Sequence, residues 1–248
     1  MSFERKIAVG AHDIDINCNA TPTAILRFLQ DTVDENMRIC GPSYQQLMNE
    51  KKSFVVSRTA LELFRPLKEY EPLTVYTWAT AGRAVTFPRS FEIKSGEDTV
   101  LRCQMMWALV DLNTRSFIKG SDFSVESYGT GELIELSTPT RFRLSPDTEL
   151  KKVGERRVMY SDIDKNLHMN NTRYFDMLFD YIPEREKLWM SSCQVNYISE
   201  APYGETIEIY MSDPFDEADE RVYYFKTVVN GKDGITARMG VKNIANQK

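Results

Sequence analysis

The amino-acid sequence predicts an α+β protein in tandem duplication, in which each half is a long helix wrapped by an antiparallel sheet. The chain of 248 residues is long for one small domain and short for two average ones. Residues 13–31 align without a gap on residues 162–180, where seven of nineteen positions are identical at an offset of 149. A weaker match at an offset of 134 pairs Glu71 with Glu205. The chain is therefore predicted to hold two copies of one unit.

The first half begins with an extended stretch over residues 6–15, and a helix follows it. Thr21 can cap this helix. Pro22 suits its first turn because an N–H at that position has no hydrogen-bond partner within the helix, so its absence in proline costs nothing. Gly41 is expected just beyond its end. Apolar residues recur along it at helical spacing: Ile25, Leu26, Leu29, Val33 and Met37. Four strands are then predicted, over residues 53–64, 73–81, 86–93 and 100–111.

The second half repeats this order. An extended stretch covers residues 153–163, and Asn170 or Asn171 can cap the helix that follows. Its apolar stripe comprises Tyr174, Phe175, Leu178, Phe179 and Ile182, and Pro183 then interrupts the helix or starts another. Four strands are predicted after it, over residues 190–198, 206–211, 222–229 and 234–242.

Each four-stranded meander must bury one face, and the helix is the largest partner available to it within its half. Wrapping the sheet around the helix buries both surfaces, which is the arrangement of the hotdog fold. Two such units side by side can join their sheets and cover an exposed edge. We therefore predict a tandem double hotdog, with an N-terminal hotdog over residues 1–125, a linker over residues 126–150 and a C-terminal hotdog over residues 151–248.

Composition excludes several classes of protein. The apolar fraction of 42% and the charged fraction of 27% are those of an ordinary globular chain. The longest uninterrupted apolar run, residues 105–110, is far shorter than the roughly 20 residues of a membrane span. A net charge of −5 argues against a nucleic-acid partner. Residues 1–7 lack the apolar stretch of a secretory signal, so a cytoplasmic location is expected.

Cysteine and histidine counts argue against a metal site. The four cysteines show no Cys-x-x-Cys spacing, so neither a zinc site nor a redox pair is predicted. A reducing compartment is the default for such a chain. The two histidines, His12 and His168, are too few for a histidine-rich site. We expect no metal and no cofactor.

The two copies differ at one informative place. The spaced Asp-Asn-Asn of residues 15–19 becomes Asp164, Asn166 and His168 in the second half. Asp and Asn gather before helices because they form caps and turns, so a structural interpretation of this segment stays open. The second copy nevertheless places a carboxylate, a carboxamide and an imidazole beside a helix N-terminus, where developing negative charge is favoured. Such groups can act as nucleophile or base, orienting group and proton donor.

Residues 161–171, Ser-Asp-Ile-Asp-Lys-Asn-Leu-His-Met-Asn-Asn, resemble the signature of the acyl-acyl-carrier-protein thioesterases of plant plastids and bacteria. Those enzymes are double-hotdog hydrolases that release fatty acids from fatty-acid synthesis. Residues 53–58 and 106–115 are similar to that family's N-terminal strands. The resemblance implies hydrolysis of a fatty acyl-carrier-protein thioester, acyl-carrier protein as the partner, and a homodimer.

By position, the resemblance gives catalytic roles to Asp164, Asn166 and His168 and, after a later strand, to Glu200. Plant members often have a cysteine beside this glutamate, but Ala201 follows it here, so a cysteine nucleophile at that place is excluded. Two routes stay open. Asp164 attacks the thioester and forms an acyl-aspartyl anhydride, or a carboxylate activates a water molecule.

The first half is expected to hold the acyl chain without cleaving it. It lacks the histidine, and the offset of 134 places Pro66 opposite Glu200. Residues of the stripe over 25–33 could line a tunnel between helix and sheet, although core packing is favoured for most of them. The preferred chain length depends on small pocket differences that the sequence does not show.

A basic run precedes the site and is a candidate docking patch for an acidic carrier protein, although solvated charge is the favoured interpretation. Its members are Arg141, Arg143, Lys151, Lys152, Arg156 and Arg157. Other functions stay open as well. An acyl-CoA or aryl-CoA thioesterase would use the same site with another carrier. A hotdog dehydratase is disfavoured because both carboxylates would be surplus to its site of a histidine plus an acid. A regulator would bind an acyl group without hydrolysing it, but no basic helix-turn-helix is evident at either end.

Overall fold

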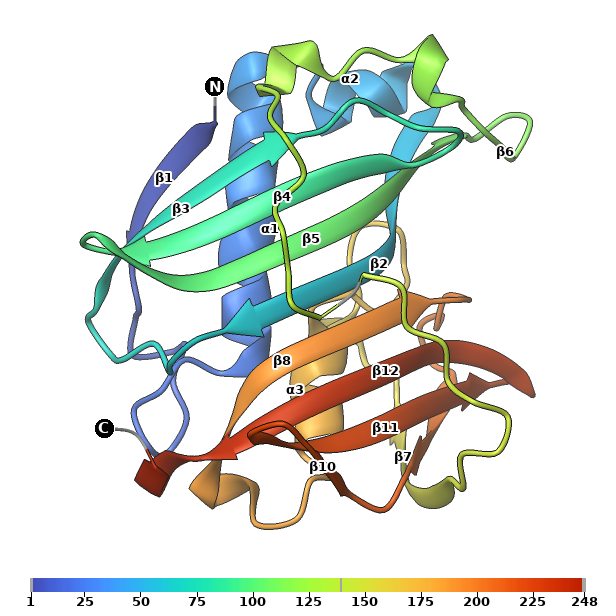
Figure 1. Ribbon diagram of the computed structural model, residues 1–248. Coiled ribbons are helices and arrows are strands. Elements are labelled where there is room, and N and C mark those ends of the chain that lie inside the picture. Colours follow the sequence, from blue (N-terminus) through green and yellow to red (C-terminus); the bar gives the residue numbers. More distant parts are fainter. Residues whose placement is uncertain (1, 139, 247–248) are drawn as a thin grey trace.

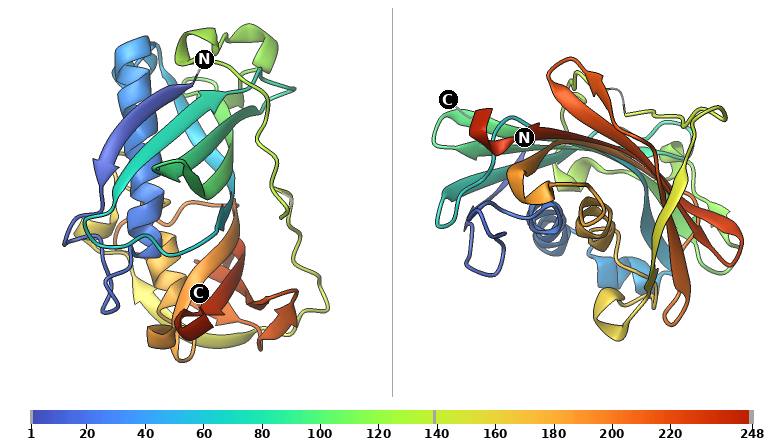
Figure 2. Two further views of the ribbon diagram at one scale, coloured as in Figure 1. Left: turned by 60° about the vertical axis from the view of Figure 1, so that its left-hand side comes forward. Right: turned by 90° about the horizontal axis from the view of Figure 1, so that it is seen from below.

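One continuous antiparallel sheet runs through the molecule and curves around the helices (Figures 1 and 2). The structure is a computed structural model, and it describes residues 2–138 and 140–246. The α-helices are α1 (Pro22–Cys40), α2 (Tyr44–Asn49) and α3 (Arg173–Phe179). The strands of the first half are β1 (Phe3–Ala8), β2 (Lys52–Leu63), β3 (Pro72–Ala79), β4 (Phe87–Ser95), β5 (Asp98–Asp111) and β6 (Ser116–Phe117). Those of the second half are β7 (Lys151–Arg157), β8 (Leu188–Tyr197), β9 (Thr206–Met211), β10 (Phe215–Glu217), β11 (Glu220–Val229) and β12 (Lys232–Asn243).

The sheet joins the two halves through their central strands. Its order is β1-β3-β4-β5-β2-β8-β12-β11-β9-β7, with β6 paired to β5 and β10 paired to β11. Strands β2 and β8 run antiparallel, with Arg58 opposite Asn196 at one end of the pairing and Glu62 opposite Ser192 at the other. Each central strand thereby has a neighbour on both sides and leaves no open edge. The tandem double hotdog predicted from the sequence is confirmed.

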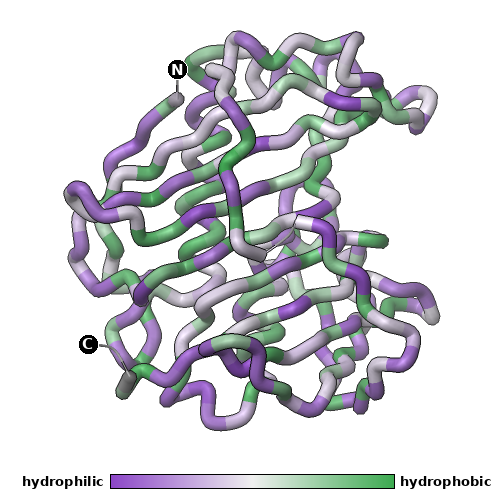
Figure 3. The backbone as a smooth tube through the Cα atoms, in the orientation of Figure 1, coloured by the Kyte–Doolittle hydropathy of each residue, from purple (hydrophilic) through white to green (hydrophobic). Residues whose placement is uncertain are grey.

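The strands formed where the sequence predicts them. All eight predicted meander strands are present, with ends that differ by at most two residues. Along β3, buried residues alternate with more exposed ones, as a sheet with one face on the core requires. The same alternation of hydropathy follows the strands in Figure 3. The opening extended stretches end earlier than predicted, because each runs into an Asp- and Asn-rich loop.

Helix α1 has the ends that its sequence predicts. The side chain of Thr21 accepts the N–H of Ala24 at 3.2 Å, and Pro22 occupies the first turn. Gly41 has φ of 55°, a conformation that favours glycine, and its N–H bonds to the carbonyl of Met37. Helices α1 and α3 lie side by side on the concave face of the sheet (Figure 2).

Helix α3 is shorter than the sequence predicts. It has seven residues and ends at Phe179, although the apolar stripe continues to Ile182. Pro183 cannot donate a helical hydrogen bond, and Glu184 takes a left-handed φ of 53°, so the chain turns away. No α-helix in the described residues is both long and apolar enough to cross a lipid bilayer.

The connection between the halves crosses the convex face of the sheet (Figure 1). Several hydrogen bonds fix it to strands that it crosses. Trp78 Nε1 donates to the carbonyl of residue 132 at 2.6 Å, the hydroxyl of Ser137 donates to Glu62 at 2.6 Å, and Asn196 Nδ2 donates to the carbonyl of Phe142 at 2.9 Å. The connection therefore covers part of the sheet, while the domain boundaries at residues 125 and 150 stay predictions.

Candidate active site

The segment with the predicted catalytic residues is a tight loop that comes before α3. The N–H of Asp164 bonds to the carbonyl of His168 at 3.0 Å, and the N–H of Leu167 bonds to the carbonyl of Asp164 at 3.0 Å. Leu167 completes the turn with a left-handed φ of 64°. On the far side, the N–H of Met169 bonds to the carbonyl of Ala201 at 2.9 Å. The last bond brings the loop against the segment that carries Glu200.

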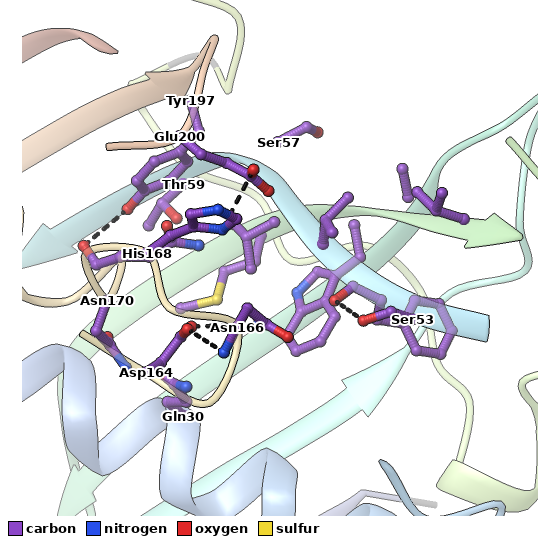
Figure 4. A pocket seen from close by; sticks show the side chains of 18 of the residues that line it. Gln30, Ser53, Ser57, Thr59, Asp164, Asn166, His168, Asn170, Tyr197 and Glu200 are labelled. Atoms are coloured by element: carbon purple, nitrogen blue, oxygen red, sulfur yellow. Dashed lines mark hydrogen bonds and ion pairs between the residues drawn. The ribbon is translucent and has the colours of Figure 1, made fainter. Parts of the chain in front are cut away.

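Asp164 and Asn166 form one half of the site (Figure 4). One carboxylate oxygen of Asp164, Oδ1, accepts the backbone N–H of Asn166 at 2.8 Å. The other, Oδ2, accepts the side-chain Nδ2 of Asn166 at 3.4 Å. The first bond is the local turn that the structural interpretation of this motif predicts. It leaves Oδ2 as the oxygen of Asp164 best placed for chemistry.

His168 and Glu200 form the other half (Figure 4). Nδ1 of His168 lies 3.2 Å from Oε2 of Glu200. The imidazole is partly buried, with 30% of its side chain exposed, whereas Glu200 is 67% exposed. A carboxylate at Nδ1 fixes the ring and favours a proton on that nitrogen, which leaves Nε2 to exchange a proton with a reactant. The structure thus brings together all four residues predicted from the sequence.

A cavity of about 710 Å³ connects these groups with the N-terminal half. All four residues line its wall, together with parts of α1, α2, β2 and β5. Its apolar lining includes Leu26, Met37, Phe54, Met105 and Trp107. A cavity of this size accommodates an organic ligand of moderate length. Of the helical stripe, Leu26 and Met37 reach the cavity, whereas Ile25, Leu29 and Val33 are packed in the core, as favoured for most of the stripe.

Polar groups that sequence reasoning missed also line the cavity beside the loop. Gln30 and Asp34 lie one turn apart on α1, and burial raises the pKa of the Asp34 carboxyl. Burial also lowers the pKa of the Lys165 ammonium, whose Nζ lies over the ring of Tyr44. The spacing of Gln30 and Asp34 signals a shared helix face, but nothing in the sequence places Tyr44 against the second half.

Two backbone N–H groups at the entry to the second helix, where developing negative charge is expected to be favoured, already have partners. The N–H of Thr172 donates to the side chain of Asn170 at 2.9 Å, and the N–H of Arg173 donates to its carbonyl at 2.9 Å. These two donors are therefore already engaged by the chain itself. The prediction that Asn170 or Asn171 caps this helix is wrong, because Thr172 precedes its first residue and no side chain caps it. Asn170 instead holds the turn just before the helix through the N–H of Thr172.

A thiol nucleophile has no place in this cavity. None of its lining residues in the described part of the chain is a cysteine. Cys193 is fully buried in β8, and burial raises the pKa of its thiol. Ala201, next to Glu200, is buried as well. The acid–base groups of the cavity are therefore carboxylates, an imidazole, an ammonium and tyrosine phenols.

Half of the basic run ahead of the site is neutralised locally. Lys151 pairs with Asp213 at 2.6 Å, Lys152 pairs with Glu155 at 2.6 Å, and Arg156 pairs with Asp162 at 2.5 Å. A salt-bridged side chain offers less charge to an incoming anion. The favoured interpretation of solvated, locally balanced charge suits these three residues.

Two family models together match most of the chain. The model described as the acyl-ACP thioesterase N-terminal domain matches residues 1–128, and the model described as the acyl-ACP thioesterase C-terminal domain matches residues 146–242. A curated relative, the chloroplastic oleoyl-acyl carrier protein thioesterase of Coriandrum sativum, is 23% identical over 88% of this chain. The chain spans only 64% of that relative's length.

Solved structures share the fold over nearly the full chain. An acyl-ACP thioesterase from Bacteroides thetaiotaomicron has 20% sequence identity and a TM-score of 0.84, covering 97% of this chain and 98% of its own. The 12:0-ACP thioesterase from Umbellularia californica has 15% identity and a TM-score of 0.81, covering 98% of this chain and 94% of its own. At such identities the likeness establishes the double-hotdog architecture.

Proposed function

The chain belongs to the acyl-acyl-carrier-protein thioesterase family, and we propose that it hydrolyses the thioester of a fatty acyl group carried by acyl-carrier protein. One observation carries this proposal. A largely apolar cavity leads from the N-terminal half to a wall where Asp164, Asn166, His168 and Glu200 meet. Such a cavity can bury an acyl chain and present its carbonyl carbon to acid–base groups. The products are the free fatty acid and the thiol of the carrier protein.

The N-terminal half supplies most of the proposed acyl-binding surface. Leu26 and Met37 come from α1, Phe54 from β2, and Met105 and Trp107 from β5. Each methylene buried against such residues contributes about 0.8 kcal/mol to binding. Binding energy therefore grows with chain length until the cavity is full. This division of labour supports the predicted roles of an acyl-binding N-terminal unit and a catalytic C-terminal unit.

The proposed reaction adds water across the carbon–sulfur bond of the thioester. Either Oδ2 of Asp164 attacks the carbonyl carbon and water then opens the anhydride, or a carboxylate removes a proton from the attacking water. In the anhydride route water attacks Cγ of Asp164, so the oxygen of water stays in Asp164 and the former Oδ2 leaves in the fatty acid. In the direct route the hydroxyl group of water ends in the fatty acid. In both routes a proton reaches the leaving thiolate. His168 is the proposed proton carrier through Nε2, and Glu200 holds its ring. Nδ2 of Asn166 steadies Asp164.

Several finer assignments belong to this proposal. The partner is an acyl-carrier protein, since the family is named for that substrate. A homodimer stays a prediction, because the central strands β2 and β8 pair with each other within one chain and need no second chain for their hydrogen bonds. The cytoplasmic location also stays a prediction; the four free cysteines fit a reducing compartment.

The proposal is tested with a panel of acyl groups from short to long, each offered both as a carrier-protein thioester and as a CoA thioester. We expect release of free fatty acid, with a higher kcat/KM for carrier-protein thioesters. Faster turnover of CoA thioesters would make the chain an acyl-CoA thioesterase. Stoichiometric acyl binding without turnover would make it an acyl-binding protein.

The assigned carboxylate is tested by Glu200→Gln, which keeps the shape of the side chain and removes its charge. We expect kcat to fall by about 10–100-fold, because the imidazole loses the carboxylate that orients it. Glu97→Gln is the matched control, since Glu97 lies in the exposed turn between β4 and β5. Equal activity of both variants would remove Glu200 from the mechanism.

A single turnover in ¹⁸O-water tests the anhydride route, which is established if the label enters Asp164.

A further inference from the structure

The catalytic loop is touched by a short helix of the other half. Helix α2 follows α1 in the N-terminal unit, and its first residue, Tyr44, lines the active-site cavity. The hydroxyl of Tyr44 donates to Oδ1 of Asn166 at 3.1 Å. Nζ of the adjacent Lys165 lies over the face of the same ring. Two consecutive loop residues therefore contact one side chain that the N-terminal half provides.

The position of Tyr44 is fixed by its own half. Ser43 and Gln46 form a capping box at the start of α2, with bonds of 2.7 and 3.3 Å between them. Leu47, three residues after Tyr44, is fully buried in the core. The tyrosine ring thus projects from an anchored turn rather than from a free surface loop.

The chemistry of the partners sets the orientation of the Asn166 amide. An ionised carboxylate can only accept hydrogen bonds, so the NH₂ group of Asn166 must be the part that faces Oδ2 of Asp164. The carbonyl oxygen Oδ1 then faces Tyr44, whose hydroxyl must donate to it. A tyrosine hydroxyl can also accept, so the carboxylate of Asp164 sets which end of the amide faces it, and the hydroxyl of Tyr44 supplies the second contact that holds the amide in that orientation.

The first half shows the opposite arrangement at the matching position. Asn17 is the counterpart of Asn166, and its Nδ2 donates to the backbone carbonyl of Glu186 at 2.9 Å. Each of these asparagines is thus contacted from the other half of the molecule. In the first half this contact uses the NH₂ group of Asn17, and in the second half it uses the amide oxygen of Asn166. The NH₂ group therefore stays on the side of Asp164 in the half that has the histidine.

We propose that Tyr44 is a positioning residue for catalysis, which holds the Asn166 amide so that its NH₂ group faces Asp164. The proposal rests on the proposed thioester hydrolysis. It gives the N-terminal half a second task besides binding the acyl chain, because its α2 completes the site of the other half. Tyr44 acts through Asn166, so removing its hydroxyl affects the chemical step and leaves the apolar side chains that line the acyl cavity unchanged.

The kinetic test is Tyr44→Phe. We expect kcat to fall by about tenfold with KM changed by less than about twofold, since one hydrogen bond of the reacting arrangement is lost. Tyr210→Phe is the matched control, because its hydroxyl also donates to a side chain, Glu208 at 3.3 Å, and Tyr210 does not line the cavity. In an Asn166→Ala background the same change at Tyr44 should have no further effect. Unchanged kcat, or effects that multiply, would overturn the proposal.

A second measurement does not depend on activity. The side-chain NH₂ signals of Asn166 are followed by ¹H–¹⁵N NMR in the wild type and in both tyrosine variants. We expect Tyr44→Phe to shift these signals and to accelerate their exchange with solvent, while Tyr210→Phe leaves them in place. Unchanged Asn166 signals in Tyr44→Phe would overturn the positioning role. If the wild-type chain hydrolyses no thioester, the proposed function fails and these signals still decide whether Tyr44 orients the amide.

Discussion

The loop over residues 10–21 and the loop over residues 159–170 share one backbone and differ in their chemistry. Asp13 accepts the N–H of Gly10 at 3.0 Å, and its counterpart Asp162 accepts the N–H of residue 159 at 3.0 Å. The N–H of Asp15 bonds to the carbonyl of residue 19 at 2.8 Å, as that of Asp164 does to residue 168 at 3.0 Å. The duplication therefore kept the turn in both copies.

The side chains of the two loops differ in what they contact, which separates structural side chains from the proposed catalytic ones. Asp15 and Asp164 both accept the N–H of the asparagine two residues later, at 2.8 Å in each loop. At the position of His168, the first loop has Asn19, whose oxygen accepts the Lys68 ammonium at 2.6 Å instead of facing a carboxylate. The carboxylates thus serve a turn in both copies, and the imidazole paired with an acid occurs in one.

The largest expected effect comes from replacing His168 with the residue of the first loop. His168→Asn should fold normally, because Asn19 already fits the same backbone, and should lower kcat/KM by about 10²–10⁴-fold through loss of proton transfer. Turnover of a carrier-protein thioester and thermal unfolding check both parts. Asn19→His is the control and should gain no activity, because Pro66 and Lys68 offer no carboxylate there. Retained activity in His168→Asn would put the proton transfer elsewhere.

The two repeats in the sequence predict some contacts of the site and miss others. The offset of 149 aligns the loops, and the offset of 134 aligns their neighbours, since the N–H of Ala20 bonds to residue 67 and that of Met169 to residue 201. Both offsets come from local patterns that the fold preserves, so Glu200 could be placed opposite Pro66. The contact of Tyr44 with Asn166 spans 122 residues, and Tyr44 lies outside the aligned segments. Such a contact depends on how two units dock, which no local pattern encodes.

The two aspartates of the matching turns are expected to contribute alike to stability and differently to turnover. Asp15→Ala and Asp164→Ala should each lower the melting temperature by roughly 2–6 °C, because each removes one or two hydrogen bonds to backbone N–H groups. Only Asp164→Ala should abolish turnover, whereas Asp15→Ala should keep kcat within about twofold. Thermal unfolding and thioester turnover of both variants check this. Equal loss of activity in the two would mean that the first loop takes part in catalysis.

The smallest expected effect concerns Asp176 of α3, which takes the position of Arg27 in the repeat. Its carboxylate accepts the N–H of Thr23 at 2.8 Å and the hydroxyl of Thr21 at 3.3 Å, at the start of α1. Burial nevertheless raises its pKa above the ordinary value of 3.8. A raised pKa means that the folded state holds the proton more tightly, so stability is lost as pH rises from about 4 through the folded-state pKa and stays lower above it.

Asp176→Asn removes that ionisation and keeps an oxygen for the N–H of Thr23. We expect its melting temperature to exceed that of the wild type by about 1–3 °C at pH 7, and the difference to vanish at about pH 3, where the wild-type carboxyl is protonated as well. Asp147→Asn, at an exposed turn, is the control and should show no such pH-dependent difference. If Asp176→Asn is less stable at both pH values, the hydrogen bonds of the carboxylate to α1 outweigh its burial. The contact between the two helices would then depend on hydrogen bonds to an ionised carboxylate, which the second half supplies at Asp176 and the first half, with Arg27 at that position, does not.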